Sequence, residues 1–473
     1  MRFHAFLYVA FLAIVARVLY LLPGRARKAW LLTSSYAFYA SWSLPYLGLL
    51  VGVAALNCWG ARWIERGRRR TWRAMWILAI DLLVLVFFKY VRPLRVGVAS
   101  LASLTGLDLF PAAIAWVIPL GISYYLLETI GYIVEVARRR EVPRSFVDMQ
   151  LFVAFFPKLI VGPIVRAGEL LPQVDSRIQA SAEDVVSGIQ QIIVGLFLKV
   201  VLAAGFALPL ADLFSRDPAT LGWRDAWVMA VAFGIQLYLT FAGYARIARG
   251  SARLFGIHLM DNFQYPYSAT SVAEFWSRWH VSLWRWLEDY VRTPLVGLSP
   301  SRPRLVGATL VTMIAFGLWH GPAWTLIAGG AYQGLLLAAH GLWRGSGGIQ
   351  NAASEKPRRW HVVTTPLAVG ATFGAVSLGW LLFRSETLSQ GLSLMRVALS
   401  PWAGRSRPLD EFTLDTAVMA VAVAAAGFLV PAAEQRLAAL SATAGSRYGF
   451  VAAIGEGFAY ATLLVFAIAY WRW

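Results

Sequence analysis

Phe275-Trp276-Ser277-Arg278-Trp279-His280 begins the most informative stretch of this sequence, and Gly317-Leu318-Trp319-His320-Gly321-Pro322 ends it. The first segment predicts an amphipathic helix over 275–292, because apolar and polar residues alternate at helical spacing. One face of that helix would carry Trp276, Trp279, His280, Leu283, Leu287 and Tyr290, and the other Arg278, Arg285, Asp289 and Arg292. The second segment closes an apolar run, Leu305–Trp319, that is long enough to enter a bilayer, and the Gly-Pro pair is predicted to stop it.

The composition around this stretch is that of a membrane protein. Of 473 residues, 58% are hydrophobic and only 14% are charged, too few to cover a soluble surface of this size. Apolar runs of about 20 residues recur, which is the length that crosses a hydrocarbon core. Because these runs are continuous rather than alternating, they exclude a porin-like barrel and predict a single polytopic α-helical domain.

A short apolar piece at 150–165 is interrupted by Pro157, Gly162 and Pro163, and it is predicted to re-enter the membrane without crossing it. The first run is too long for a signal-peptide core and is expected to remain as a transmembrane helix. The predicted spans are 3–22, 29–42, 44–64, 72–91, 114–136, 185–208, 226–248, 304–320, 323–343, 362–383, 413–431 and 449–470.

The net charge of +18 does not indicate nucleic acid. The basic residues form short clusters between apolar runs, which is the positive-inside pattern of membrane proteins. Counting spans from these clusters places both termini on the side away from the cytoplasm.

The single cysteine, Cys58, excludes an internal disulfide and a cysteine-based metal site. Zinc is not expected at His280 and His320 either, because neither has a cysteine or carboxylate beside it at ligand spacing. We therefore predict no metal.

Charged side chains inside apolar spans are costly and are candidates for function. Arg17 and Lys199 fit a snorkelling or packing role. Asp81 and Glu128 are expected to have a buried partner, such as an arginine.

His320 is the stronger of the two histidine candidates. It ends a helix beside Trp319, at a Gly-Pro break whose unpaired carbonyls favour a cavity. A neutral imidazole there could take a proton from a hydroxyl, or it could be an ordinary core residue, and the spacing leaves both open. His280 shares its face with tryptophans, so packing is the default, although a helix lying along the membrane interface also fits.

The broken segment ends at Arg166, which offers a third candidate. Irregular backbone at membrane depth is tolerated where it is buried in protein or faces water. Arg166 could therefore bind an anionic group such as a phosphate of the donor, or simply anchor the segment at the interface.

Several of these motifs, in this order, resemble the membrane-bound O-acyltransferase family, in particular its bacterial alginate O-acetyltransferase branch. The resemblance covers a core of about residues 28–396, followed by the predicted C-terminal helices 413–431 and 449–470. The matching pieces are 118–123, 155–157 through 162–166, Asn262-Phe263 with Pro266-Tyr267, 275–280 running to 286–290, 317–321 and Leu382-Phe383-Arg384.

The resemblance implies an all-α integral membrane fold, a ring of about 11–12 tilted helices with re-entrant segments around a central tunnel. It implies that a cytosolic acyl thioester meets a hydroxyl acceptor there, with His320 as the essential base and His280 assisting. Arg166, Trp279, Trp319 and Asn262 lie in the matching motifs and are predicted to bind substrate or donor.

The sequence also departs from the family pattern. Two acids of the family appear here as Thr240 and Arg246. After His320, the usual Asn, Trp and His are Thr325, Gly329 and Gln333, and an early Gln is Glu128.

We therefore predict an O-acyltransferase of the bacterial inner membrane that moves an acetyl or other short acyl group from a thioester such as acetyl-CoA. The acceptor would be a surface polysaccharide or glycolipid, or a relay partner such as a secreted esterase-like transferase. The alternative, motivated by Thr240 and Arg246, is a non-catalytic acyl-donor channel or scaffold of a polysaccharide-modification complex. A proton-coupled transporter fits less well, because no acidic relay or repeat is visible.

Overall fold

The computed structural model describes residues 6–102, 118–141, 144–175, 178–297, 301–344, 364–402 and 413–418. The chain divides into two compact units. The first comprises residues 1–192 and 247–260, and the second comprises 193–246 and 261–473. The chain passes between them within the helices Ala182–Leu196 and Trp223–Arg253 and again in the loop after Met260, and each unit is described separately.

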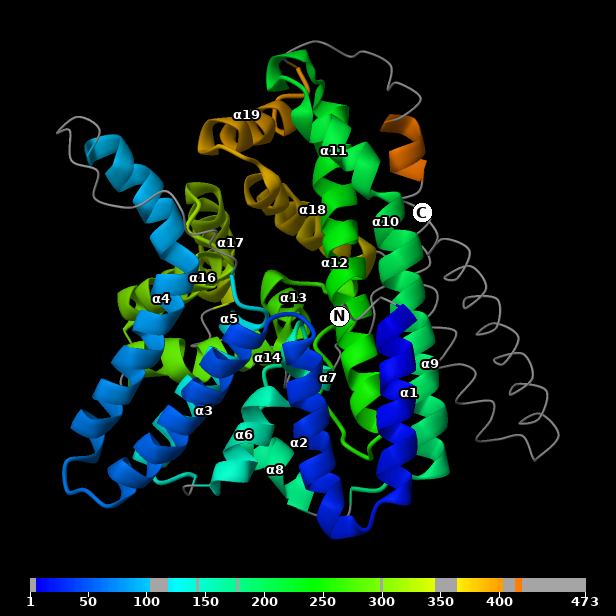
Figure 1. The fold of residues 1–473 in the computed structure, drawn as a ribbon. Coiled ribbons are helices and arrows are strands. Elements are labelled where there is room, and N and C mark those ends of the chain that lie inside the picture. The colour runs from blue at the N-terminus through cyan, green and yellow to red at the C-terminus, as the bar shows by residue number, and fades with distance from the viewer. Residues whose placement is uncertain are drawn as a thin grey trace. The chain divides into compact units, whose positions relative to one another are not determined.

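The first unit is built from helices that follow the apolar runs (Figure 1). They are α1 (Phe6–Leu21), α2 (Gly24–Ala40), α3 (Leu44–Glu65), α4 (Arg70–Ala102), α5 (Ile122–Ala137), α6 (Phe146–Ala154), α7 (Phe156–Leu159), α8 (Ala167–Asp175) and the start of α9 (Ala182–Leu196).

The core of the first unit is aromatic. Phe156, in the short helix α7, packs on Tyr8 and Phe11 of α1, on Phe38 of α2 and on Phe255, with ring centroids 5.3–6.3 Å apart. Its backbone N–H donates to the side chain of Ser35. The broken segment is therefore anchored by its neighbours rather than by a helix of its own.

Two buried carboxylates of this unit have partners that the sequence did not reveal. Both have the buried partners that the sequence led us to expect, but the partner suggested as an example, an arginine, is found for neither. Asp81 Oδ1 accepts from Asn57 Nδ2 at 3.0 Å and its Oδ2 from the Thr129 hydroxyl at 3.3 Å. Glu128 forms an ion pair with Lys158, and its other oxygen accepts the Val165 N–H at 3.1 Å.

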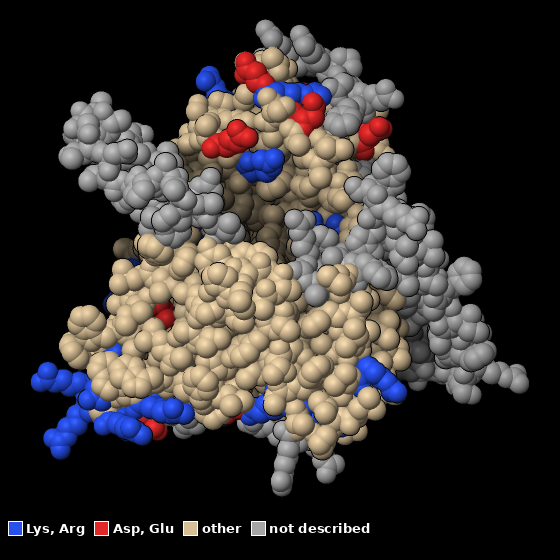
Figure 2. Space-filling view, in the orientation of Figure 1, with Lys and Arg blue, Asp and Glu red and all other residues tan. Residues whose placement is uncertain are grey.

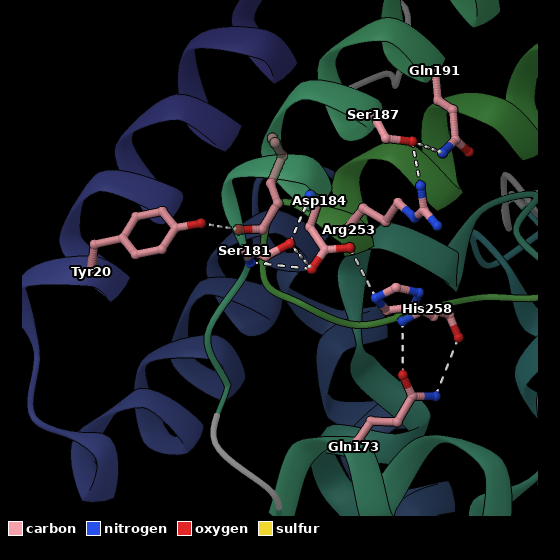
Figure 3. Close-up of polar contacts among 9 residues, drawn as sticks. Tyr20, Gln173, Ser181, Asp184, Ser187, Gln191, Arg253 and His258 are labelled. Carbon is pink, nitrogen blue, oxygen red and sulfur yellow. Dashed lines mark hydrogen bonds and ion pairs between the residues drawn. The ribbon is translucent and has the colours of Figure 1, made fainter. Parts of the chain in front are cut away.

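A polar cluster holds the end of α12 against α8 and α9 (Figure 3). Asp184 accepts from His258 Nε2 at 3.0 Å, and Gln173 bonds both the N–H and the carbonyl of His258. Arg253 donates to Ser187, which also accepts from Gln191.

Basic residues gather at one end of the first unit. Arg62, Arg66, Arg68 and Arg69, around the α3–α4 connection, are exposed. On the face drawn in Figure 2, Lys and Arg side chains line the lower edge, where Figure 1 places that connection. Exposed Trp59, Trp72 and Trp76 stand near the same helix ends, as in the aromatic belts of membrane interfaces.

Within the described residues, the second unit holds the α- and π-helices that remain, together with short 3-10 turns at Pro218–Thr220 and Pro266–Ser268. The α- and π-helices are the end of α9, the π-helical turn Phe197–Leu202, α10 (Ala203–Gly205), α11 (Ala207–Ser215), most of α12 (Trp223–Arg253), α13 (Val272–Arg278), α14 (Val281–Leu287), the π-helical turn Glu288–Arg292, α15 (Thr293–Val296), α16 (Arg302–His320), α17 (Trp324–Arg344), α18 (Thr364–Arg384) and α19 (Leu388–Ala398).

Glycines let α16 and α17 pack closely in the second unit. A Cβ added at Gly317 would stand 2.2 Å from the Leu326 carbonyl oxygen, and one at Gly330 would stand 2.2 Å from that of Met313. Helix α18 then packs on α17, where the Tyr332 hydroxyl and Gln333 Nε2 donate to the carbonyls of Ala375 and Val376. The last turn of α16 is therefore packed closely against α17, which in turn is tied to α18.

The all-α membrane architecture is confirmed. Among the described residues, five helices are long and apolar enough to cross a membrane: Leu44–Glu65, Arg70–Tyr90, Ala182–Ser215, Trp223–Arg253 and Pro366–Arg384. The segment 150–165, predicted to be interrupted at its prolines and glycine, is indeed broken: α6 ends at Ala154 and the short α7 runs from Phe156 to Leu159. The predicted span 449–470 lies outside the described residues, as does 413–431 beyond residue 418.

Candidate active site

The chain breaks its helix at the first histidine. Helix α13 starts at Val272, with the Ser271 side chain accepting the Glu274 N–H, and it ends at Arg278. Trp279 is extended, and His280 adopts the left-handed conformation with φ 46° and ψ 52°. The predicted continuous helix over 275–292 is therefore wrong.

Asn262 explains the break. Its carbonyl accepts the Val281 N–H and its side-chain Oδ1 accepts the Ser282 N–H, both at 3.0 Å. The next residue, Phe263, forms an isolated β-bridge with Trp279. These contacts satisfy the first amide groups of α14, which a continuing helix would have bonded internally. Asn262, predicted to bind substrate, is 1% exposed and holds the turn that carries His280.

The second histidine ends a helix as predicted. Helix α16 stops at His320, and Gly321 follows in extended conformation with its N–H bonded to the Leu318 carbonyl at 3.0 Å. Three aromatic rings surround the imidazole, with centroids at 4.7 Å (Phe316), 4.7 Å (Trp319) and 4.9 Å (Phe383). His320 itself is only partly buried.

Trp319 connects the two histidines. Its ring contacts His320 at 4.7 Å and His280 at 5.9 Å, edge-on in both cases. Residues far apart in sequence are thus brought to one indole, which is partly exposed. The fold therefore places both predicted catalytic side chains in one small region of the second unit.

The environment keeps His280 neutral. The side chain is 5% exposed, and burial lowers its pKa to about 4 from the usual 6.5. Desolvation disfavours the charged form of a buried imidazole. At neutral pH this ring can therefore both donate and accept a hydrogen bond, one nitrogen in each role.

Trp279 lies deeper than Trp319. Its ring stacks on Phe275 at 5.4 Å and lies 5.2 Å from Trp380 of α18, and only 3% of the residue is exposed. This packing links the turn at His280 to α18. A contact between Trp279 and substrate stays a prediction.

A buried ion pair follows this turn. Glu288 and Arg292 lie in the π-helical turn, joined through Oε1 and Nη1 at 2.7 Å, and Arg292 also reaches Thr309 of α16. The sequence placed Arg292 on the polar face of the predicted helix. Arg292 is instead buried, where Glu288 and Thr309 satisfy its guanidinium group.

The remaining residues singled out from the sequence lie on other elements of the chain. Arg166 belongs to the first unit, where it directly precedes α8 and its N–H donates to Glu169 at 3.3 Å. Thr240 and Arg246, at the positions of the family's acids, lie on α12 and are partly buried. Among the described residues, no group of three His, Cys, Asp or Glu side chains is placed to hold a metal ion.

Two aromatic neighbours of His320 were not singled out from the sequence. Phe316 lies one helical turn before His320, so the spacing alone could have found it. Phe383 comes from another helix, and its only sequence signal was its place in the motif Leu382-Phe383-Arg384.

Comparison with known proteins identifies the family to which this chain belongs. Residues 133–346 match the family model of membrane-bound O-acyltransferases. The chain is 36% identical over 388 residues to a probable alginate O-acetylase AlgI of Azotobacter vinelandii, covering 80% of this chain and 74% of the relative. It is 31% identical over 429 residues to a peptidoglycan O-acetyltransferase of Helicobacter pylori, covering 83% and 77%.

A more distant relative is the teichoic acid D-alanyltransferase of Streptococcus thermophilus. The two are 30% identical over 285 residues, which cover 56% of this chain and 68% of that protein. The relatives thus share acyl transfer in their names but differ in acceptor and in acyl group.

Proposed function

This chain belongs to the membrane-bound O-acyltransferase family, and from that premise we propose that it moves an acetyl or other short acyl group to a surface glycan. The donor is a cytosolic thioester, acetyl-CoA, and the acceptor is a hydroxyl of a cell-surface polysaccharide or glycolipid, or of a relay protein. The proposal rests on one observation: the imidazoles of His280 and His320 both contact the indole ring of Trp319.

His320 acts as the general base in this proposal. Its imidazole takes the proton of the acceptor hydroxyl as the oxygen forms a bond to the thioester carbonyl carbon. The carbon–sulfur bond then breaks, and the departing thiolate receives the proton. A base positioned in this way contributes about 10²–10⁴ in rate.

His280 supports the same step in its neutral form. Because burial keeps its pKa near 4, it stays uncharged at neutral pH and orients the acceptor or stabilises the developing oxyanion as a hydrogen-bond donor. Its fixed turn, held by Asn262, provides the required preorganisation.

The basic residues at one end of the first unit support an orientation of the protein in the membrane. Exposed arginines around the α3–α4 connection are typical of cytoplasmic loops, so we place this end at the cytoplasmic face of the bacterial inner membrane. From the count of predicted spans we propose that both termini lie on the opposite side. A secreted esterase-like transferase is a candidate relay partner on that side, and Arg166 is a candidate contact for a donor phosphate.

Mass spectrometry of surface glycans from cells with and without this gene tests the function. We expect one acyl mark to disappear on deletion and to return with the wild-type gene. His320→Ala should not restore it, whereas His340→Ala, a histidine change on α17, should. An unchanged glycan profile after deletion would refute the proposed acceptor class, and full restoration by His320→Ala would refute the mechanism.

An assay of the purified protein distinguishes an enzyme from a non-catalytic scaffold, the alternative function suggested by Thr240 and Arg246. A scaffold binds acetyl-CoA without consuming it, even when glycan from the deletion strain is supplied. We expect consumption that depends on His320.

A further inference from the structure

The ring of Phe383 occupies the space beside the predicted catalytic base. Of the three rings that surround His320, those of Phe316 and Trp319 come from α16, the helix of His320 itself. Phe383 comes from α18, meets the imidazole edge-on at a centroid distance of 4.9 Å, and is partly exposed. It is therefore the neighbour contributed by a different helix.

Close packing of α17 against α18 fixes this ring. A Cβ added at Gly329 would stand 3.2 Å from Phe383 Cδ2, which is tighter than ordinary contact. Position 329 is one where the family resemblance expected a tryptophan. Four residues on, Gln333 Nε2 donates to the Val376 carbonyl at 3.0 Å and ties the two helices together. Without a side chain at 329, the phenyl ring can lie against α17 next to His320.

Phe383 is also supported from its own helix. Trp380 packs on it at 5.7 Å, and Trp380 in turn contacts Trp279 at 5.2 Å. A continuous series of aromatic contacts thus joins Phe383 to the turn that carries His280. Side chains packed in this way resist displacement, because extra volume in a close-packed region forces strained rotamers or backbone shifts.

We infer that Phe383 sets the upper length of the acyl group, which rests on the proposed function. The reacting carbonyl must lie beside the hydroxyl that His320 deprotonates, so the first acyl carbons lie beside the imidazole as well. An acetyl group ends there. A longer chain must pass the rings around His320, and Phe383 is the one that comes from a different helix than the base, with Trp380 packed behind it. The substrate class is therefore acetyl or a similarly short acyl thioester.

The test uses purified full-length protein with acetyl-, butyryl- and hexanoyl-CoA, and glycan from the deletion strain as acceptor. The variants are Phe383→Ala and Phe383→Leu, which remove most or part of the ring. We expect the ratio of butyryl to acetyl kcat/KM to rise by at least about tenfold in Phe383→Ala, since one methylene in a fitted pocket changes selectivity by about 10–200-fold. Phe383→Leu should show a smaller rise.

Phe373→Ala is the matched control. It removes a phenyl ring from the same helix, where that ring packs on Tyr267 at 5.0 Å, so it reports general disturbance of α18. Its butyryl to acetyl ratio should equal that of wild type. An unchanged ratio in Phe383→Ala, or loss of transfer for all chain lengths in both Phe383 variants, would overturn the inference. If wild-type protein transfers no acetyl group, the proposed function fails instead.

Discussion

Replacing Lys158 with methionine should strongly destabilise the first unit. The Lys158 and Glu128 side chains are 1% and 2% exposed, and they form an ion pair between α7 and α5. The substitution leaves the Glu128 carboxylate buried, with the Val165 N–H at 3.1 Å as a remaining donor. Breaking a buried pair from one side typically costs about 3–5 kcal/mol, because one charge is left uncompensated.

Cys58 provides the assay. It is the single cysteine of the chain, lies in α3 of the same unit and is 1% exposed, so a thiol-reactive fluorogenic dye reports unfolding of this unit. At roughly 2–4 °C per kcal/mol for a unit of this size, the expected fall in Tm is roughly 6–20 °C. Lys199→Met, which alters a lysine that lies over the Tyr244 ring in the other unit, is the control and should change Tm little.

The double variant Glu128→Gln/Lys158→Met tests whether the two buried charges compensate each other. It removes both charges, so it should recover most of the loss seen in either single variant. Losses that simply add, or a Lys158→Met protein as stable as wild type, would refute the argument that the charges compensate each other.

Three further outcomes are expected. Because burial lowers the pKa of His280 to about 4, the folded state binds fewer protons than the unfolded state between that value and 6.5; stability should be full above pH 6.5 and fall by about 3 kcal/mol as the pH drops to 4, a slope that His280→Asn should lack in calorimetric unfolding, which also reports the second unit. Asn262→Ala leaves the Ser282 N–H without its acceptor, so kcat for acetyl transfer should fall about 5- to 100-fold with little change in KM, and an unchanged kcat would contradict the role given to this turn. Gly250→Ala places a Cβ 2.5 Å from the Gly188 carbonyl oxygen, so it should lower the free energy of unfolding by about 1–3 kcal/mol in the Cys58 dye assay. Gly48→Ala, where an added Cβ has nothing within 4 Å, should not.

The helices and the end of α16 could be predicted from the sequence because apolar length and a Gly-Pro stop are local signals. The turn at His280 could not. Residues 275–292 keep a helical pattern of apolar side chains, but Asn262, far upstream, supplies the hydrogen bonds that favour a break. A tertiary contact of this kind overrides local periodicity and leaves no mark in the segment that it changes.

The buried charges illustrate the same limit. The sequence identified Asp81 and Glu128 as groups that needed partners, since charges are costly in apolar spans. It did not identify Asn57, Thr129 or Lys158 as those partners, because they lie on other helices or in the broken segment. The need for a partner is a local property, whereas the partner's identity depends on which helices meet.

At position 280, the left-handed backbone favours one kind of residue for stability, whereas the proposed catalysis requires another. An L-residue with a β-carbon pays roughly 1–2 kcal/mol for this conformation, while glycine avoids the cost and asparagine tolerates it better than most. A library selected for heat resistance alone should therefore accumulate glycine or asparagine at 280 and lose its imidazole. Directed evolution of this protein therefore needs a catalytic selection in every round, because thermal screening alone selects against this histidine.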